Sequence, residues 1–415
     1  MDLIIGAGIS GIAYATFTNN DYLMIDKDDE IGGYCKTIKR NGYVWDYSGH
    51  FFHFRDEKLK DLVCKHITPN TLKTVKKVTK IYYKGKYIDF PFQKNIHQLE
   101  KEEFIECLYD LFNTENIQVK TFKDMVYANL GKGICDKFLI PYNEKLYACD
   151  LNHLDAGAMG RFFPKANRED IILNFKKENN SSYNDSFVYS SGGAIEYVNS
   201  LFKNVNSQNV FLGEKLLKID IKNKKAYTSE REIVYDNLIS TMPFPELLDL
   251  CKIPYDKSVF SWNKVMVFNL GFDQKGNDTE SSWVYVPDKE ICFYRLGYYD
   301  NIIKSDKMSL YVELGFSKDY KIENVETILE KVLSDLKRIG IITNQKLIDY
   351  QSIVMDPAYV HINQKSTQAV KYFKNELAMH NIFSIGRYGS WTYCSIEDNI
   401  TEARELCQKM KFIQD

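Results

Sequence analysis

The sequence has 415 residues, more than one ordinary hydrophobic core accommodates, so we expect two or three subdomains. Its 54 Lys and Arg residues nearly balance 56 Asp and Glu residues, and a formal net charge of -2 gives no general reason to bind nucleic acid or an anionic membrane. No stretch approaches the roughly 18 apolar residues of a membrane span, and no secretion signal precedes the first motif. We therefore expect a cytoplasmic protein that binds neither nucleic acid nor membrane.

The cysteines give no sign of a metal site or of disulfides. All nine lack Cys-x-x-Cys spacing, and their number is odd. Scattered cysteines of this kind are typical of reduced thiols that serve as small buried apolar residues. We expect no bound metal.

The first predicted element is a strand, a tight turn and a helix that carry the pattern G-x-G-x-x-G. The glycines are Gly6, Gly8 and Gly11, and the residues between the last two are Ile9 and Ser10. Backbone N–H groups and the helix N-terminus at such a turn can hold a pyrophosphate. A second predicted strand ends at Asp26, about 20 residues after the first glycine, where a carboxylate reaches a ribose hydroxyl. The context predicts a dinucleotide cofactor.

Further elements follow from hydrophobic periodicity. Residues 75–87 alternate apolar and basic side chains around a Lys-Gly turn, which predicts a hairpin. Helical spacing over residues 98–160 predicts an inserted helical subdomain. Residues 210–228 resemble two strands that return toward the cofactor unit. The pattern over 256–362 is strand-rich with a helix near 325–339, and the last helix begins near Ile396.

The residues after Asp26 narrow the choice of cofactor. The run I-D-K-x-x-x-x-G-G, which contains Lys27, Gly32 and Gly33, resembles the FAD-binding flavoproteins of the amine-oxidase and protoporphyrinogen-oxidase superfamily. An ordinary turn at the paired glycines is the alternative. Residues 238–243 resemble the strand-to-proline turn of that superfamily, and residues 382–386 resemble its late strand near the flavin. The resemblance implies FAD, bound by Gly6, Gly8, Ile9, Ser10, Gly11, Asp26, Lys27, Gly32, Gly33, His50, Gly386 and Arg387.

A more specific resemblance begins at residues 48–53, S-G-H-F-F-H. They are similar to the G-x-H-x-F-H segment of UDP-galactopyranose mutases, with Ser48 in place of a glycine. Residues 90–95, 142–147 and 386–393 resemble three further segments of that family in the same order. Two further positions depart from the pattern: Tyr147 replaces a uracil-stacking tryptophan, and Ser395 replaces an acidic residue.

In those mutases the N5 atom of reduced flavin is a nucleophile toward the anomeric carbon of a nucleotide sugar. The resemblance implies His50, Arg295 and Arg387 as catalytic residues. It implies substrate contacts from Tyr147, Arg161, Tyr183, Arg295, Arg387 and Tyr393. A guanidinium is permanently charged and can grip phosphate oxygens in a bidentate fork. Each of these residues could instead have only a structural role, as a surface arginine, a core tyrosine or a packing histidine. His50 and His53 are spaced like a pair of metal ligands, but no third ligand is visible in the sequence.

We therefore expect an α/β fold with a Rossmann-like FAD-binding domain, an inserted helical subdomain and an antiparallel β-sheet substrate subdomain. The expected boundaries are 1–75, 190–250 and 370–415 for FAD binding, 98–160 for the helices, and 76–97, 161–189 and 251–369 for the sheet. The expected activity is an FAD-dependent nucleotide-sugar mutase of surface polysaccharide biosynthesis, supplied with electrons by a reductant such as NAD(P)H and compatible with a homo-oligomer. The alternatives are an FAD-dependent amine-oxidase-like oxidoreductase and a non-catalytic protein stabilised by FAD.

Overall fold

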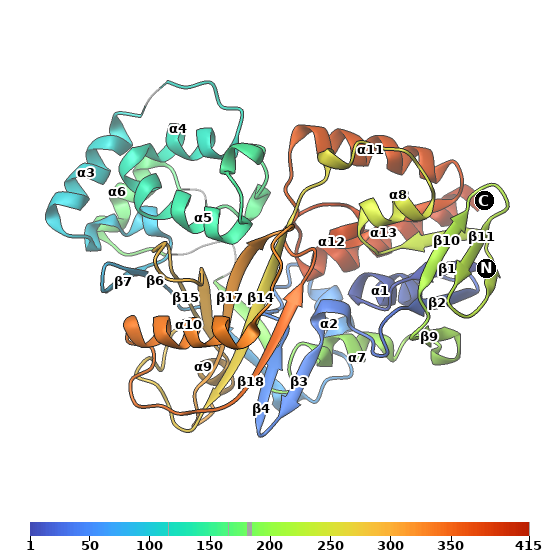
Figure 1. Cartoon of the computed structure of the whole chain (residues 1–415), viewed down its shortest axis with the longest axis horizontal. Coiled ribbons are helices and arrows are strands. Elements are labelled where there is room, and N and C mark those ends of the chain that lie inside the picture. Colours follow the sequence, from blue (N-terminus) through green and yellow to red (C-terminus); the bar gives the residue numbers. More distant parts are fainter. Residues whose placement is uncertain (115, 165, 181–184, 415) are drawn as a thin grey trace.

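A computed structural model describes residues 1–114, 116–164, 166–180 and 185–414. A parallel sheet with its helices occupies one end of the molecule, and an antiparallel sheet and a helical group occupy the other (Figure 1). This arrangement confirms the predicted α/β fold class with its Rossmann-like unit, helical subdomain and antiparallel sheet. None of the described helices is long and apolar enough to cross a membrane.

The parallel sheet has five strands, and the strand that leads into the glycine motif lies at its centre. In spatial order the strands are β19 (Ile382–Ser384), β13 (Asn237–Ser240), β1 (Asp2–Ile5), β2 (Tyr22–Asp26) and β9 (Val210–Leu212). Each pairs with its neighbours in parallel. Successive side chains of a strand point to opposite faces, so Ile4 belongs to one buried cluster whereas Leu3 and Ile5 belong to another.

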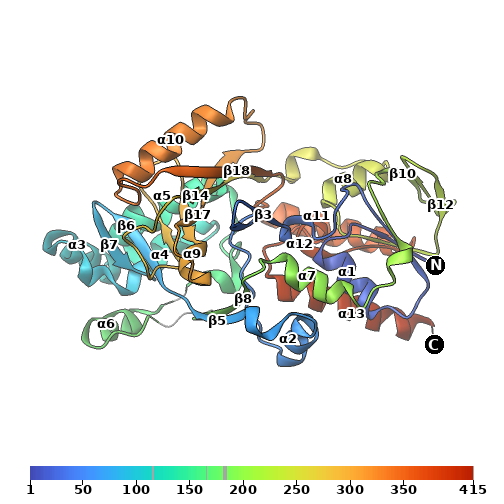
Figure 2. The same ribbon diagram turned by 90° about the horizontal axis from the view of Figure 1, so that it is seen from below.

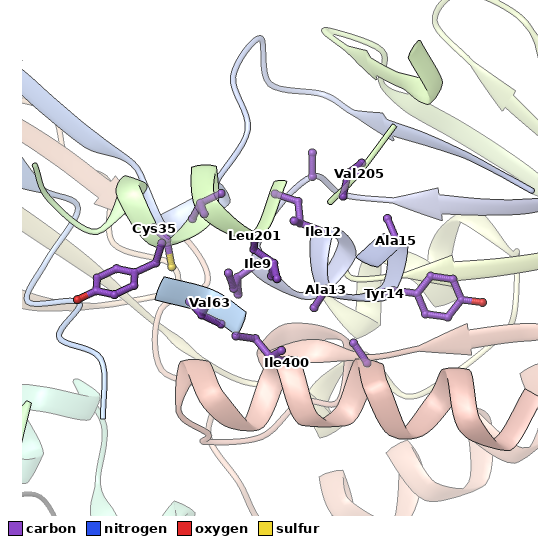
Figure 3. Packing of buried hydrophobic residues seen from close by; sticks show 14 of the residues in the cluster. Ile9, Ile12, Ala13, Tyr14, Ala15, Cys35, Val63, Leu201, Val205 and Ile400 are labelled. Carbon is purple, nitrogen blue, oxygen red and sulfur yellow. The ribbon is translucent and has the colours of Figure 1, made fainter. Parts of the chain in front are cut away.

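Helices cover one face of this sheet, and a mixed layer covers the other. The first layer contains α1 (Ile9–Phe17), α2 (Glu57–Cys64), α7 (Ile195–Phe202) and α13 (Ile396–Gln414). Figure 3 shows Ile12 and Ala13 of α1 packed between this layer's other members, with Ile400 of α13 among them. The second layer contains α8 (Phe244–Leu250), α11 (Gln364–Ala378) and a small sheet of β10 (Leu216–Asp220), β11 (Lys225–Thr228) and β12 (Glu232–Val234). Figure 2 shows α7 and α13 on one side and α8 and β10 on the other.

The segment predicted as two strands at residues 210–228 forms three, so that prediction is wrong in number. The chain turns at Gly213, whose φ of 73° is in the left-handed region that favours glycine. This turn leaves β9 in the parallel sheet and directs β10 into antiparallel pairing with β11.

The second large sheet has seven strands and is antiparallel except where β15 meets β6. In order these are β18 (Leu347–Met355), β14 (Asn263–Phe272), β17 (Ser309–Ser317), β16 (Arg295–Tyr298), β15 (Trp283–Tyr285), β6 (Thr79–Tyr83) and β7 (Lys86–Asp89). The predicted hairpin is confirmed as β6 and β7, which are joined at Lys84 and Gly85. The predicted helix near 325–339 is α10 (Val325–Arg338), which packs on one face of the sheet, and α9 (Tyr299–Ile303) follows β16. The opposite face is rich in aromatic side chains.

The helical group contains α3 (Lys101–Phe112), α4 (Phe122–Ile134), a π-helical turn at Cys135–Leu139, α5 (Ile140–Tyr147) and α6 (Arg168–Lys176). The predicted helical character of residues 98–160 is confirmed. Within the range expected for the sheet subdomain, α6 packs on the helical group, because its Ile171 is buried in a cluster with residues of α3, α4 and α5. Two further sheets have two strands each. In one, β8 (Ser186–Ser190) pairs with β5 (Leu72–Lys76), and in the other, β3 (Thr37–Arg40) pairs with β4 (Tyr43–Asp46).

Candidate functional site

A cavity of about 1020 Å³ lies between the glycine turn, the antiparallel sheet and the helical group. Its lining begins at Gly6, Gly8 and Asp26, and reaches Arg295 on β16 and Tyr142 on α5. Pockets for one small ligand usually have volumes of about 300–1,000 Å³. This cavity therefore has room for a cofactor together with a second ligand.

The glycine turn presents unused backbone donors to the cavity. Gly8 caps α1 without a side-chain hydrogen bond, so the first N–H groups of the helix are available to an anion. A Cβ atom on Gly11 would lie 2.0 Å from the carbonyl oxygen of Gly6, so only glycine allows α1 to pack this closely on the turn. Ile9 and Ser10 line the cavity, whereas Gly11 has this packing role behind it.

Asp26 lies at the end of β2, beside the turn. One carboxylate oxygen accepts from the N–H of Ala7 at 2.6 Å, and the other accepts from the N–H of Asp28 at 2.9 Å. Burial raises the pKa of Asp26, and these two hydrogen bonds oppose that effect. Each oxygen keeps a lone pair for a hydroxyl donor. Lys27 also lines the cavity, and Gly32 and Gly33 do so beside Gly8, with which Gly32 forms a parallel bridge.

His50 lines the cavity after β4, and its ring is neutral at pH 7. Burial and then the positive charge of Arg387 lower the pKa of His50 to about 4. Its Nδ1 atom is buried and has no hydrogen-bond partner among the described residues. His53 Nδ1 instead lies 2.9 Å from the carbonyl oxygen of Ser186. The described residues contain no cluster of three or more His, Cys, Asp or Glu side chains suited to a metal ion.

The two arginines of the cavity differ in how their charge is balanced. Arg295 forms a bidentate pair with Glu313 through Nε at 2.6 Å and Nη2 at 2.8 Å. Arg387 pairs with no carboxylate of the part of the chain that the structure describes, and its buried Nε lacks a partner there. Its guanidinium carbon lies 5.2 Å from the ring centroid of Tyr359 and 4.8 Å from that of Tyr393. Of the two arginines, Arg387 is therefore the one whose charge no carboxylate of the described residues balances.

Arg387 owes this position to the turn after β19. Gly386 begins the short helix α12 (Gly386–Gly389) with a φ of 85°, and it packs against Ser10 of the glycine turn. The backbone N–H of Arg387 donates to Oδ1 of Asn399 at 2.7 Å, and the hydroxyl of Ser10 donates to the same oxygen at 3.2 Å. The late strand and the glycine turn are therefore held together at the cavity, and Tyr393 joins its lining.

Two predicted substrate contacts, Tyr147 and Arg161, are not among the described residues that line the cavity. Tyr147 is buried behind Tyr359, with ring centroids 5.8 Å apart in an edge-to-face contact. Arg161 forms an ion pair with Asp398 at 2.5 Å and donates to the hydroxyl of Ser395 at 3.3 Å. Ser395 lines the cavity at the position where the family pattern has an acidic residue, whereas Asp398, the ion-pair partner of Arg161, is not among the described lining residues. Tyr183 lies outside the described residues.

Sequence reasoning missed many residues of the lining, including a basic side chain and a group of aromatic ones. Examples are Lys77, Tyr142, Trp283, Tyr285, Tyr311 and Tyr359. Burial lowers the pKa of Lys77 to about 8. Separate strands, loops and a helix bring these residues together, so no local motif announces them.

Comparison with known proteins agrees with this architecture. Residues 4–65 match the NAD(P)-binding Rossmann-like domain family. A crystal structure of reduced UDP-galactopyranose mutase superposes with a TM-score of 0.92 at 21% identity, over 99% of this chain and 94% of that one. Cyclohexylamine oxidase from Brevibacterium oxydans IH-35A superposes with a TM-score of 0.71 at 12% sequence identity, over 99% of both chains. The CLA-producing fatty acid isomerase from P. acnes superposes with a TM-score of 0.64 at 14% sequence identity, over 98% of both chains. The chain therefore has the fold that reduced UDP-galactopyranose mutase shows, along nearly its whole length.

Proposed function

We propose that the protein binds FAD and, with the flavin reduced, interconverts the pyranose and furanose forms of a nucleotide sugar. The observation that carries this proposal is Arg387, an uncompensated buried guanidinium in the same cavity as the glycine turn. The substrate of an amine or cyclic-substrate oxidase carries no diphosphate for a cationic group to bind. The likeness in fold to UDP-galactopyranose mutase supports the same choice.

The lining fits FAD. The N–H groups at the start of α1 and the carboxylate of Asp26 would hold the pyrophosphate and a ribose. The unpartnered Nδ1 of His50 offers a hydrogen bond to the ring system. A bound reduced flavin supplies an electron-rich ring nitrogen that can displace a leaving group from carbon.

The substrate's diphosphate is the leaving group, and its developing charge is what the protein must stabilise. Arg387 and Arg295 bind its oxygens with charge-assisted hydrogen bonds. The hydroxyl of Tyr393 donates to the same group. The aromatic walls from β15 and β17 exclude water, which strengthens these interactions. The product would serve the synthesis of surface polysaccharide.

Anaerobic incubation with candidate nucleotide sugars tests the proposal. UDP-galactopyranose and other pyranose nucleotides are each mixed with enzyme, with and without dithionite, and the isomers are separated by chromatography. We expect interconversion only with the reductant and no net consumption of electrons. Bleaching of the flavin by an amine, together with no isomerisation of any nucleotide sugar, would refute the mutase and favour the oxidase.

A further inference from the structure

We propose that Glu313 is a positioning residue that orients and neutralises Arg295, so that Arg387 supplies the net positive charge which binds the substrate's diphosphate. This inference rests on the function proposed above and goes beyond it, because it assigns different tasks to the two arginines. Glu313 also becomes the residue that limits how tightly the diphosphate is held.

The pair is built into the antiparallel sheet. Arg295 of β16 and Glu313 of β17 are direct cross-strand partners. Their two hydrogen bonds use Nε and Nη2 of the guanidinium and both carboxylate oxygens. Nη1 makes no hydrogen bond with a described residue, and Arg295 lines the cavity. The bidentate pair therefore fixes the plane of the guanidinium while one nitrogen remains for a ligand.

A third contact fixes the carboxylate itself. The hydroxyl of Ser48 donates to Glu313, and the carbonyl oxygen of Ser48 accepts from the N–H of His50 at 2.7 Å. The loop lies close to β17, because a Cβ atom on Gly49 would be 2.5 Å from the hydroxyl oxygen of Tyr311. A glycine at position 48, as expected from the resemblance, could not make the first bond. Glu313 is therefore held from two sides in one orientation.

The charge state of the pair follows from these contacts. Burial raises the pKa of Glu313, but Arg295 and the hydrogen bond from Ser48 outweigh burial and lower it overall. Glu313 is thus ionised at neutral pH, and the pair carries no net charge. An incoming diphosphate is attracted by Arg295 and repelled by the adjacent carboxylate. Arg387 has no such opposing group among the described residues.

The direction in which Glu313→Gln changes the affinity for UDP separates this role from a merely structural one. Glu313→Gln keeps the size of the side chain and one acceptor oxygen but removes the negative charge. We expect it to tighten the binding of UDP at least threefold, to tighten UMP less and to leave uridine unchanged. A damaged fold does not produce a gain of affinity that increases with ligand charge. Turnover should fall, because the guanidinium plane is less well fixed.

Three further variants complete the experiment, which uses calorimetry on the flavin-loaded protein. Arg387→Gln removes net charge and should weaken UDP binding at least tenfold, whereas the double variant Arg295→Gln with Glu313→Gln preserves net charge and should weaken it less. Asp300→Asn breaks a buried ion pair with Lys275 outside the cavity and should leave UDP affinity unchanged.

The outcomes also separate this inference from the proposed function. If the wild type binds UDP and Glu313→Gln does not bind it more tightly, or gains equally for uridine, the assignment of Glu313 is overturned. If the double variant loses as much affinity as Arg387→Gln, the division of tasks is overturned. If the wild type binds no nucleoside diphosphate at all, the proposed function itself fails.

Discussion

Asp46, at the end of β4 and just before the His50 loop, makes the stability of the protein depend on pH. Its side chain is fully buried. One carboxylate oxygen accepts from the hydroxyl of Thr37 at 2.6 Å and from the N–H of Ala194 at 2.9 Å, and the other accepts from the hydroxyl of Tyr189 at 2.7 Å. Burial raises the pKa of Asp46 from 3.8 to about 6, against the opposing effect of these hydrogen bonds.

The raised pKa sets both the sign and the size of the effect. Between pH 4 and 6 the folded protein binds a proton that the unfolded chain has released, so stability falls as pH rises through this window. A difference of about two pKa units corresponds to about 3 kcal/mol, at about 1.4 kcal/mol for each unit. This stabilisation is complete below pH 4 and is lost above pH 6.

Asp46→Asn should therefore stabilise the protein at neutral pH. The amide oxygen can accept from Thr37 and Ala194, and the amide nitrogen can donate to Tyr189, whose hydroxyl then acts as the acceptor. We expect the variant and the wild type to be equally stable near pH 4, and the variant to be more stable by up to about 3 kcal/mol at pH 8.

Urea unfolding followed by fluorescence between pH 4 and 8 measures the difference. Asp335→Asn is the control of opposite sign: burial raises the pKa of Asp335, but hydrogen bonds from Lys331 and Cys292 outweigh burial and lower it overall. That variant should lose stability at neutral pH. An Asp46→Asn protein that is less stable than the wild type at pH 8, or that keeps the pH dependence of the wild type, would refute the reasoning.

Three further predictions concern the site. Gly11→Val places atoms against the carbonyl of Gly6, so the purified variant should lack the flavin absorbance that we expect of the wild type; a yellow variant would contradict the packing argument. Burial lowers the pKa of His53 to about 4, so stability should fall as pH decreases from 6.5 to 4, and His53→Asn should reduce that loss in thermal unfolding curves. Burial lowers the pKa of Lys77 to about 8, so the affinity of the wild type for UDP should weaken as pH rises through 8, whereas Lys77→Arg should keep its affinity. Equal pH profiles of UDP affinity for the two proteins would exclude a role for this charge.

The parts of the site that depend on adjacent residues could be predicted from the sequence. The glycine turn, Asp26 and the turn at Gly386 are such features, because a strand, a turn and a helix form from consecutive residues and carry their own signature. The hairpin at β6 and β7 was predictable for the same reason.

The parts that depend on register and packing could not be predicted. The pairing of Arg295 with Glu313 follows from the alignment of β16 with β17, which no local pattern specifies. The burial of Tyr147 follows from the position of Tyr359, which reaches the cavity from a distant loop. Residues 161–189 show neither strong alternation nor a strong helical face, so the placement of α6 in the helical group was hidden as well.

The order of strands in the parallel sheet has a consequence for synthesis of the chain. Residues leave the ribosome in chain order, so β1 emerges before β13 and α13. It must wait for β13 before its second edge is paired, and α1 remains without its covering partner until α13 has been made. Contacts between such distant segments form slowly. The glycine turn therefore reaches its folded packing only after α13 has emerged, and until then the apolar face of α1 lacks its covering helix.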